Sequence, residues 1–189
     1  MRARIAPALL MLLALSACAT GSLPEKMVAS TPAAPTETPG GDGIHPYQGE
    51  LMQCVPYARE VSGIDITGDA WSWWDGSLGR YERGHQPRFM SVLVLSRTQR
   101  LKLGHVAVVM DIINPREIRV THANFGWDSA SRHIIYDSMP AIDVSAANDW
   151  SLVRFWNYDA KAWGIIYEAS GFIYPEKLET VTAGPVPTS

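Results

Sequence analysis

The stretch QCVPYAREV at residues 53–61 decides how the fold begins. Pro56 is tolerated in the first turn of a helix, where its missing N–H is not needed, and no helix-breaking residue follows before Gly63. The stretch therefore predicts a short helix that ends at Gly63 and carries Cys54 at its N-terminus. The unpaired N–H groups and the positive end of the helix dipole favour a thiolate there, and they can hold the negative oxygen of a tetrahedral intermediate.

The residues after this helix predict a second short helix and then a series of strands. Asp69 can cap a helix over 70–74, which carries three closely spaced tryptophans. Such a cluster can stack on carbohydrate, but it more often belongs to the core, where we expect at least Trp71 to lie. Apolar, β-branched and aromatic residues then predict strands at 92–95, 105–111, 118–121, 133–136, 151–156 and 172–174. Helices followed by antiparallel strands predict an α+β fold.

The N-terminal residues predict export and lipidation. A positively charged start precedes an apolar run at 5–15, which is too short to span a bilayer. The run ends in LSAC at 15–18, which is similar to the lipobox of bacterial lipoproteins. We therefore expect residues 1–17 to be a signal peptide and Cys18 to become the lipidated N-terminus. The alternative is an ordinary secretory signal, and either one exports the protein.

The composition predicts one domain between two polar segments. Residues 18–43 are rich in Ala, Pro, Thr and Gly, which is typical of a disordered linker. Residues 44–175 are long enough for a domain with its own core, and 176–189 form a flexible tail. The formal net charge of −3 argues against nucleic acid as a partner. We expect a monomer.

One cysteine and one histidine are candidates for nucleophilic chemistry. If Cys18 is lipidated, Cys54 has no partner, and an unpaired cysteine in an exported protein is a candidate reactive thiol. A buried, inert cysteine is the alternative. The stretch GHVAVV at 104–109 places His105 at the start of an apolar strand. Because a thiolate attacks and an imidazole protonates the leaving amine, Cys54 and His105 are the candidate nucleophile and base.

The turn after the His105 strand indicates a third member. Asn114–Pro115 is the natural turn, and a four-residue loop over 113–116 pairs His105 with Asn124. Directly opposed residues share a face, and the alternation of a strand puts His122 on that face too. Either side chain can fix the tautomer and orientation of the imidazole, as the third member of a triad does. We predict that Asn124 is the third member. A shift of one or two residues in the loop would place His122 in that role instead.

Six motifs, in order, resemble the CHAP family, the cysteine- and histidine-dependent amidohydrolases and peptidases of the papain-like superfamily. They are QCVPYAR (53–59), GDAWSWW (68–74), GHVAVV (104–109), HANF (122–125), NDWSLVRFW (148–156) and GFIYP (171–175). The resemblance implies a papain-like, NlpC-type α+β fold with N-terminal helices packed on an antiparallel β-sheet. It also implies a peptidoglycan hydrolase with Cys54 as nucleophile, His105 as base and a polar residue of the next strand as orienter. Some members carry Glu at the position of His122, with Asn two residues on.

Within this family the bond cleaved would be the N-acetylmuramoyl-L-alanine amide or a bond of the stem peptide. Gln53, beside the nucleophile, can add a donor to the oxyanion site. Two other classes are a catalytically silent, lipid-anchored module that binds peptidoglycan and a thiol-dependent acyl or peptidyl transferase. The expected partners are peptidoglycan and a membrane, to which the protein would be anchored through Cys18. Asp is absent from the position after Cys18, and this favours the outer membrane, with the protein facing the periplasm.

We expect no cofactor and no metal. A zinc site needs several Cys, His or carboxylate ligands at suitable spacings, and one thiol with scattered histidines does not supply them. His45, His85 and His133 are expected to be solvated.

Overall fold

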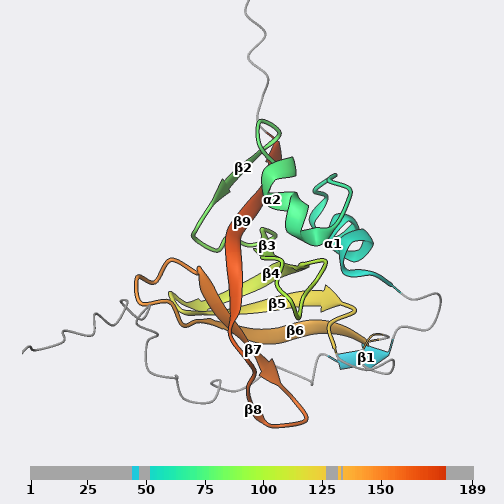
Figure 1. The fold of residues 1–189 in the computed structure, drawn as a ribbon. Coiled ribbons are helices and arrows are strands. Elements are labelled where there is room, and N and C mark those ends of the chain that lie inside the picture. The colour runs from blue at the N-terminus through green and yellow to red at the C-terminus, as the bar shows by residue number, and fades with distance from the viewer. Residues whose placement is uncertain (1–43, 47–51, 127–131, 133, 178–189) are drawn as a thin grey trace, which may run out of the picture.

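The computed structural model describes residues 44–46, 52–126, 132 and 134–177. The expected signal peptide, linker and most of the tail lie outside this range. The described elements are shown in Figure 1 and are β1 (Ile44–Pro46), α1 (Cys54–Ser62), the 3-10 helix η1 (Ala70–Ser72), α2 (Trp73–Gly76), β2 (Tyr81–Gly84), β3 (Val92–Leu95), β4 (His105–Asn114), β5 (Glu117–Ala123), β6 (Ile134–Asp143), β7 (Leu152–Asn157), β8 (Ala162–Trp163) and β9 (Tyr167–Lys177).

Six of the strands close into a ring. The strands β6, β5, β4, β3, β9 and β7 are neighbours in that order, and a further pairing of β6 with β7 joins the two ends. Every pair in the ring is antiparallel. The shorter strands β1, β2 and β8 pair with β6, β9 and β7 on the outside of this ring. The result is a small barrel, whose interior has room for side chains alone along most of its length.

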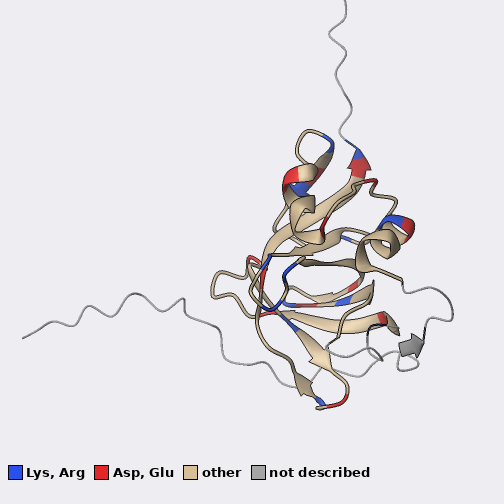
Figure 2. Ribbon diagram, turned by 45° about the vertical axis from the view of Figure 1, so that its right-hand side comes forward, with Lys and Arg blue, Asp and Glu red and all other residues tan. Residues whose placement is uncertain are grey.

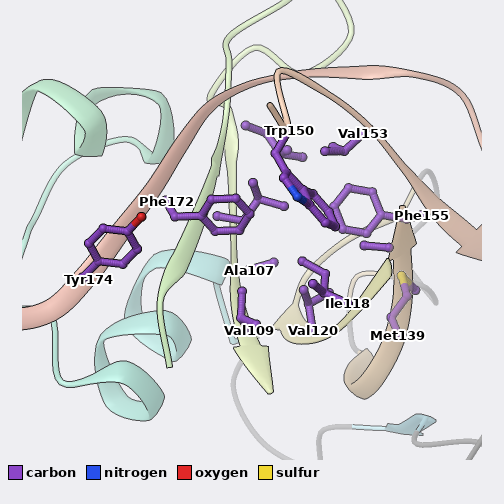
Figure 3. Packing of buried hydrophobic residues seen from close by; sticks show 13 residues of the cluster. Ala107, Val109, Ile118, Val120, Met139, Trp150, Val153, Phe155, Phe172 and Tyr174 are labelled. Atoms are coloured by element: carbon purple, nitrogen blue, oxygen red, sulfur yellow. The ribbon is translucent and has the colours of Figure 1, made fainter. Parts of the chain in front are cut away.

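The barrel interior is the main hydrophobic core. Each strand of the ring contributes two alternate residues to one buried cluster, and Trp150 joins it from the segment before β7. Figure 3 shows the aromatic rings of this cluster gathered between the strands. The members from the ring are Leu93, Leu95, Ala107, Val109, Ile118, Val120, Met139, Ala141, Val153, Phe155, Phe172 and Tyr174. Strand alternation therefore separates inward from outward residues all around the ring.

A second cluster attaches the helices to the outside of the barrel. Ala58 of α1 packs with Val106 and Val108 of β4, which alternate with the inward residues of that strand. Figure 1 shows α1 and α2 together beside β3 and β4. The helix ends as predicted, because Gly63 adopts a left-handed conformation with φ of 73° and its N–H bonds to the carbonyl of Arg59.

The tryptophan cluster differs from the prediction. Trp71 is 37% exposed, so its expected place in the core was wrong, whereas Trp73 is fully buried. The single turn of η1 directs Ala70 inward and leaves Trp71 outside, where the guanidinium of Arg97 lies 5.4 Å from its ring. Asp69 precedes η1 as expected, but its carboxylate accepts from the Trp71 indole N–H and caps no backbone group.

Several strands run further than the sequence indicated, β6 and β9 by the largest margins. β6 continues from the predicted 133–136 segment to Asp143, and its later half pairs with both β5 and β7. β9 continues two residues past Pro175, where we placed the end of the domain, because Lys177 pairs with Tyr81 of β2.

Charged residues of both signs lie mostly at the ends of elements and in loops (Figure 2). The most buried ion pair in the described part of the chain joins Arg119 and Glu117, 2.8 Å apart, on the outward side of β5.

The register of β5 against β4 sets the position of the inward residues of β5. The pairs Val108–Thr121 and Val109–Val120 have the register that we predicted. It is reached through two irregularities near the turn, and not through a regular four-residue loop.

Candidate active site

Cys54 is the first residue of α1, and two contacts fix this end of the helix against the barrel. The Tyr57 hydroxyl forms a 2.7 Å hydrogen bond with the Thr121 hydroxyl on the outward side of β5. Cys54 itself packs partly buried against the second cluster, and its thiol lies within hydrogen-bonding reach of the backbone of Val106. Val106 directly follows His105 in β4. The thiol is therefore held beside the strand end that carries the candidate base.

The surroundings of the thiol keep it protonated. Burial raises the pKa of Cys54, and hydrogen bonds from the backbone at Val106, Val55 and Cys54 offset only part of that effect. The helix N-terminus favours a thiolate, as the sequence indicated, but in the free protein burial has the larger effect. A neutral thiol that gives up its proton only on reaction is therefore the resting form.

His105 and His122 form a hydrogen-bonded pair inside one end of the barrel. The Nε2 atom of His105 lies 2.8 Å from the Nδ1 atom of His122. Both side chains are buried, with 2% and 1% of their surfaces exposed. The Phe125 ring lies over both imidazoles, 4.6 Å from the His105 ring and 4.8 Å from the His122 ring. His122 also stacks on Phe155 at 5.7 Å. Aromatic packing thus fixes the planes of both rings.

Burial keeps both imidazoles neutral. It lowers the pKa of His105 from 6.5 to about 3. Burial also lowers the pKa of His122 well below its ordinary value, and the neighbouring His105 lowers it further because two adjacent imidazolium charges repel. A neutral imidazole has one N–H and one bare nitrogen, so each ring can donate at one end and accept at the other.

Asn124 lies next to the pair but bonds elsewhere. It follows the last residue of β5 and adopts a left-handed backbone with φ of 56°. Its amide donates a 2.5 Å hydrogen bond to the Gln53 side-chain oxygen, and its own oxygen is buried without a partner. The residue hydrogen-bonded to His105 is therefore His122, although the register at Val108–Thr121 and Val109–Val120 is the predicted one. The chain leaves the strand conformation at Asn124, and this turns the amide toward Gln53.

A pocket of about 590 Å³ opens at the same end of the barrel. It adjoins the histidine pair through Phe125 and Met139, which contact the imidazoles and also line the pocket. Five of the other lining residues are aromatic, two are arginines and one is an aspartate: Tyr136, Phe155, Trp156, Tyr158, Tyr167, Arg100, Arg132 and Asp159. The mouth of a barrel is a common place for a ligand, and this one combines apolar rings with cationic groups.

The remaining sequence candidates take no part in this arrangement. Cys18, the side chain of His45, and His133 lie outside the described residues. His85 is exposed and its ring lies 5.8 Å from that of Trp74. Within the described ranges no group of three or more His, Cys, Asp or Glu side chains is arranged to hold a metal ion.

Sequence reasoning missed Met139, whose sulfur lies 3.2 Å from the Nε2 atom of His122. No motif pointed to it. Phe125 was quoted within the HANF motif, but its contact with both imidazoles was not anticipated.

No described helix is both long enough and apolar enough to cross a membrane.

Comparison with known proteins gives a match to a protein family. The CHAP domain family model matches residues 45–124, which include the thiol, both histidines, Gln53 and Asn124. No curated protein matches the chain. CHAP domains are generally cysteine- and histidine-dependent amidohydrolases or peptidases, and the matched segment contains residues of both types. Within residues 45–124 the chain is therefore similar to CHAP domains.

Proposed function

We propose that this protein is a cell-wall hydrolase that cleaves an amide bond of peptidoglycan on a papain-like fold, with Cys54 as the nucleophile. One observation carries the proposal. A thiol at a helix N-terminus lies against the backbone beside His105, and the ring of His105 is held at 2.8 Å by a second buried histidine. Thiol, base and orienter are the three parts that nucleophilic amide cleavage requires.

The proposed reaction begins from the neutral forms of thiol and imidazole. The Cys54 sulfur attacks the carbonyl carbon as its proton passes to His105, and a sulfur–carbon bond forms. The carbon–nitrogen bond then breaks, and the leaving amine takes the proton from His105. A water molecule gives a proton to His105 and attacks the thioester carbon. The sulfur–carbon bond then breaks and a carboxylic acid is released. The proton passes from His105 back to the sulfur of Cys54, which restores the thiol.

The oxyanion of the tetrahedral intermediate would lie at the N-terminus of α1. The backbone N–H groups of Cys54 and Val55 belong to the first turn, where helical N–H groups lack intrahelical partners. Gln53 precedes them, and its side-chain oxygen accepts from Asn124. This bond leaves the NH₂ group of Gln53 to donate to the oxyanion. In this proposal Asn124 positions Gln53, whereas His122 orients His105.

The pocket beside the histidines suits a wall peptide. Stem peptides carry free carboxylates, and guanidinium groups bind carboxylates with directed hydrogen bonds. Arg100 and Arg132 would meet these carboxylates while the aromatic walls cover the rest of the peptide. Arg100→Gln should therefore raise KM more than it lowers kcat.

We also propose that Cys18 is lipidated and anchors the protein to the outer membrane, facing the periplasm. The support is the lipobox-like LSAC at 15–18. Cys18→Ala should move the protein from the membrane fraction to the soluble fraction and leave its activity unchanged. Recovery of the wild type in the soluble fraction, with another N-terminus, would refute the anchor.

The function is tested by the masses of products from purified muropeptides. Hydrolysis yields a free amine and a free carboxylic acid, whereas transfer yields an adduct with an added amine. The wild type and a His85→Ala control should give the hydrolysis products, and Cys54→Ser, which keeps the side chain nearly the same size, should give none. Bound but unchanged muropeptide would identify a silent binding module. Cleavage that persists in Cys54→Ser would exclude the proposed nucleophile.

A further inference from the structure

Met139 lies on β6 beneath Phe155, where Figure 3 shows it at the margin of the buried core. It pairs with Val120, two residues before His122 on the same inward face of β5. A register irregularity between Val120 and His122 brings the β6 side chain alongside the imidazole. The Met139 sulfur thus lies 3.2 Å from the Nε2 atom of His122, and the residue is 4% exposed.

A thioether sulfur can accept a hydrogen bond but has no hydrogen to donate. The contact is therefore attractive only when the His122 Nε2 atom carries the proton and donates it to sulfur. Because His122 is neutral, its Nδ1 atom is then bare. That bare nitrogen can accept from His105, 2.8 Å away, which requires the proton of His105 to be on Nε2. One acceptor at the end of the chain thus determines both tautomers.

The consequence falls on the remaining nitrogen of His105. With its proton on Nε2, His105 has a bare Nδ1 atom, which is the form that can take a proton from a thiol. In the opposite arrangement His122 would donate from Nδ1, its bare Nε2 would face the sulfur lone pairs, and His105 would carry its proton on Nδ1. That form cannot act as a base from Nδ1.

We propose that Met139 is a positioning residue that sets the tautomers of the His105–His122 pair, so that His105 rests with a bare Nδ1 atom ready to accept the thiol proton. The catalytic consequence rests on the proposed function, but the tautomers themselves do not. They are a property of the resting protein and can be measured without substrate.

The test is nitrogen NMR of protein labelled with ¹⁵N at histidine, because protonated and bare ring nitrogens differ widely in chemical shift. The wild type should show His105 and His122 both protonated at Nε2. Met139→Leu removes the acceptor with little change in volume, a type of change that cores usually tolerate. In this variant the Nδ1-protonated forms should appear. Met110→Leu, the same exchange on β4 beside the second cluster, should leave the wild-type tautomers unchanged.

Kinetics supply a second readout. Loss of a buried hydrogen-bond partner predicts that kcat of Met139→Leu falls about tenfold, with a smaller change in KM. Wild-type protein with His122 protonated at Nδ1 would overturn the proposal whatever the variants do, and so would unchanged tautomers in folded Met139→Leu. If no muropeptide is cleaved but the tautomers respond to Met139→Leu, the proposed function fails and the role of Met139 stands.

Discussion

Acidification should unfold this domain by protonating its buried histidine pair. The pKa of His105 is about 3 in the folded protein and 6.5 as its ordinary value. Between these values the unfolded chain binds a proton that the folded chain does not, so stability is lost as the pH falls below 6.5. At pH 5, about 1.5 units below the unfolded pKa, the loss from His105 is about 2 kcal/mol. His122 shifts in the same direction, because burial and the neighbouring His105 lower its pKa well below 6.5, and it adds to this loss.

The assay is urea unfolding at pH 7 and pH 5, in which the difference in unfolding free energy is compared between variants. Carboxylates contribute about equally to every variant and cancel in the comparison. His122→Gln removes the contribution of His122, so this variant should show a smaller difference between the two pH values than the wild type. His85→Gln changes an exposed histidine and should keep the full difference. Equal pH dependence in the wild type and in His122→Gln would refute the reasoning.

Three further predictions concern the framework of the site. Gly104→Ala should destabilise the domain by about 2 kcal/mol in urea unfolding. The φ angle of Gly104 is +67°, and an added Cβ would lie 2.6 Å from the Trp71 backbone nitrogen. An unchanged unfolding free energy would contradict this geometry. Tyr57→Phe should cost about 1 kcal/mol by removing the bond to Thr121, and a thermal melt identical to the wild type would count against that bond. Cys54 should react with iodoacetamide more slowly at pH 7 than an exposed cysteine, because burial raises its pKa, and a faster rate would contradict the protonated resting thiol.

Local signals predicted the parts of the site that belong to one segment. Helix α1 (Cys54–Ser62) followed from Pro56 and from the terminating Gly63, and the strand that begins at His105 followed from its apolar run. The turn at Asn114–Pro115 also gave the register observed near Val108, although two irregularities produce it. These features depend on neighbours in the sequence, so single-segment reasoning was sufficient.

The missing parts depend on contacts between distant segments. Closure of the barrel needs β6 to pair with both β5 and β7, and no local pattern reports a second partner for a strand. The choice of His122 over Asn124 turns on the left-handed backbone that begins where β5 ends. Burial deep enough to reverse the expected lowering of the Cys54 pKa likewise comes from packing, which composition does not specify.

The most direct test of the account compares kcat for His122→Ala and Asn124→Ala on the same purified muropeptide, with both variants shown to be folded. His122 bonds the base at 2.8 Å, so its loss should lower kcat by about 100-fold or more. Asn124 acts only through Gln53, so its loss should lower kcat by less than about tenfold. A larger loss of kcat in Asn124→Ala than in His122→Ala would contradict the central claim that the hydrogen-bonded pair of His105 and His122 activates the thiol of Cys54.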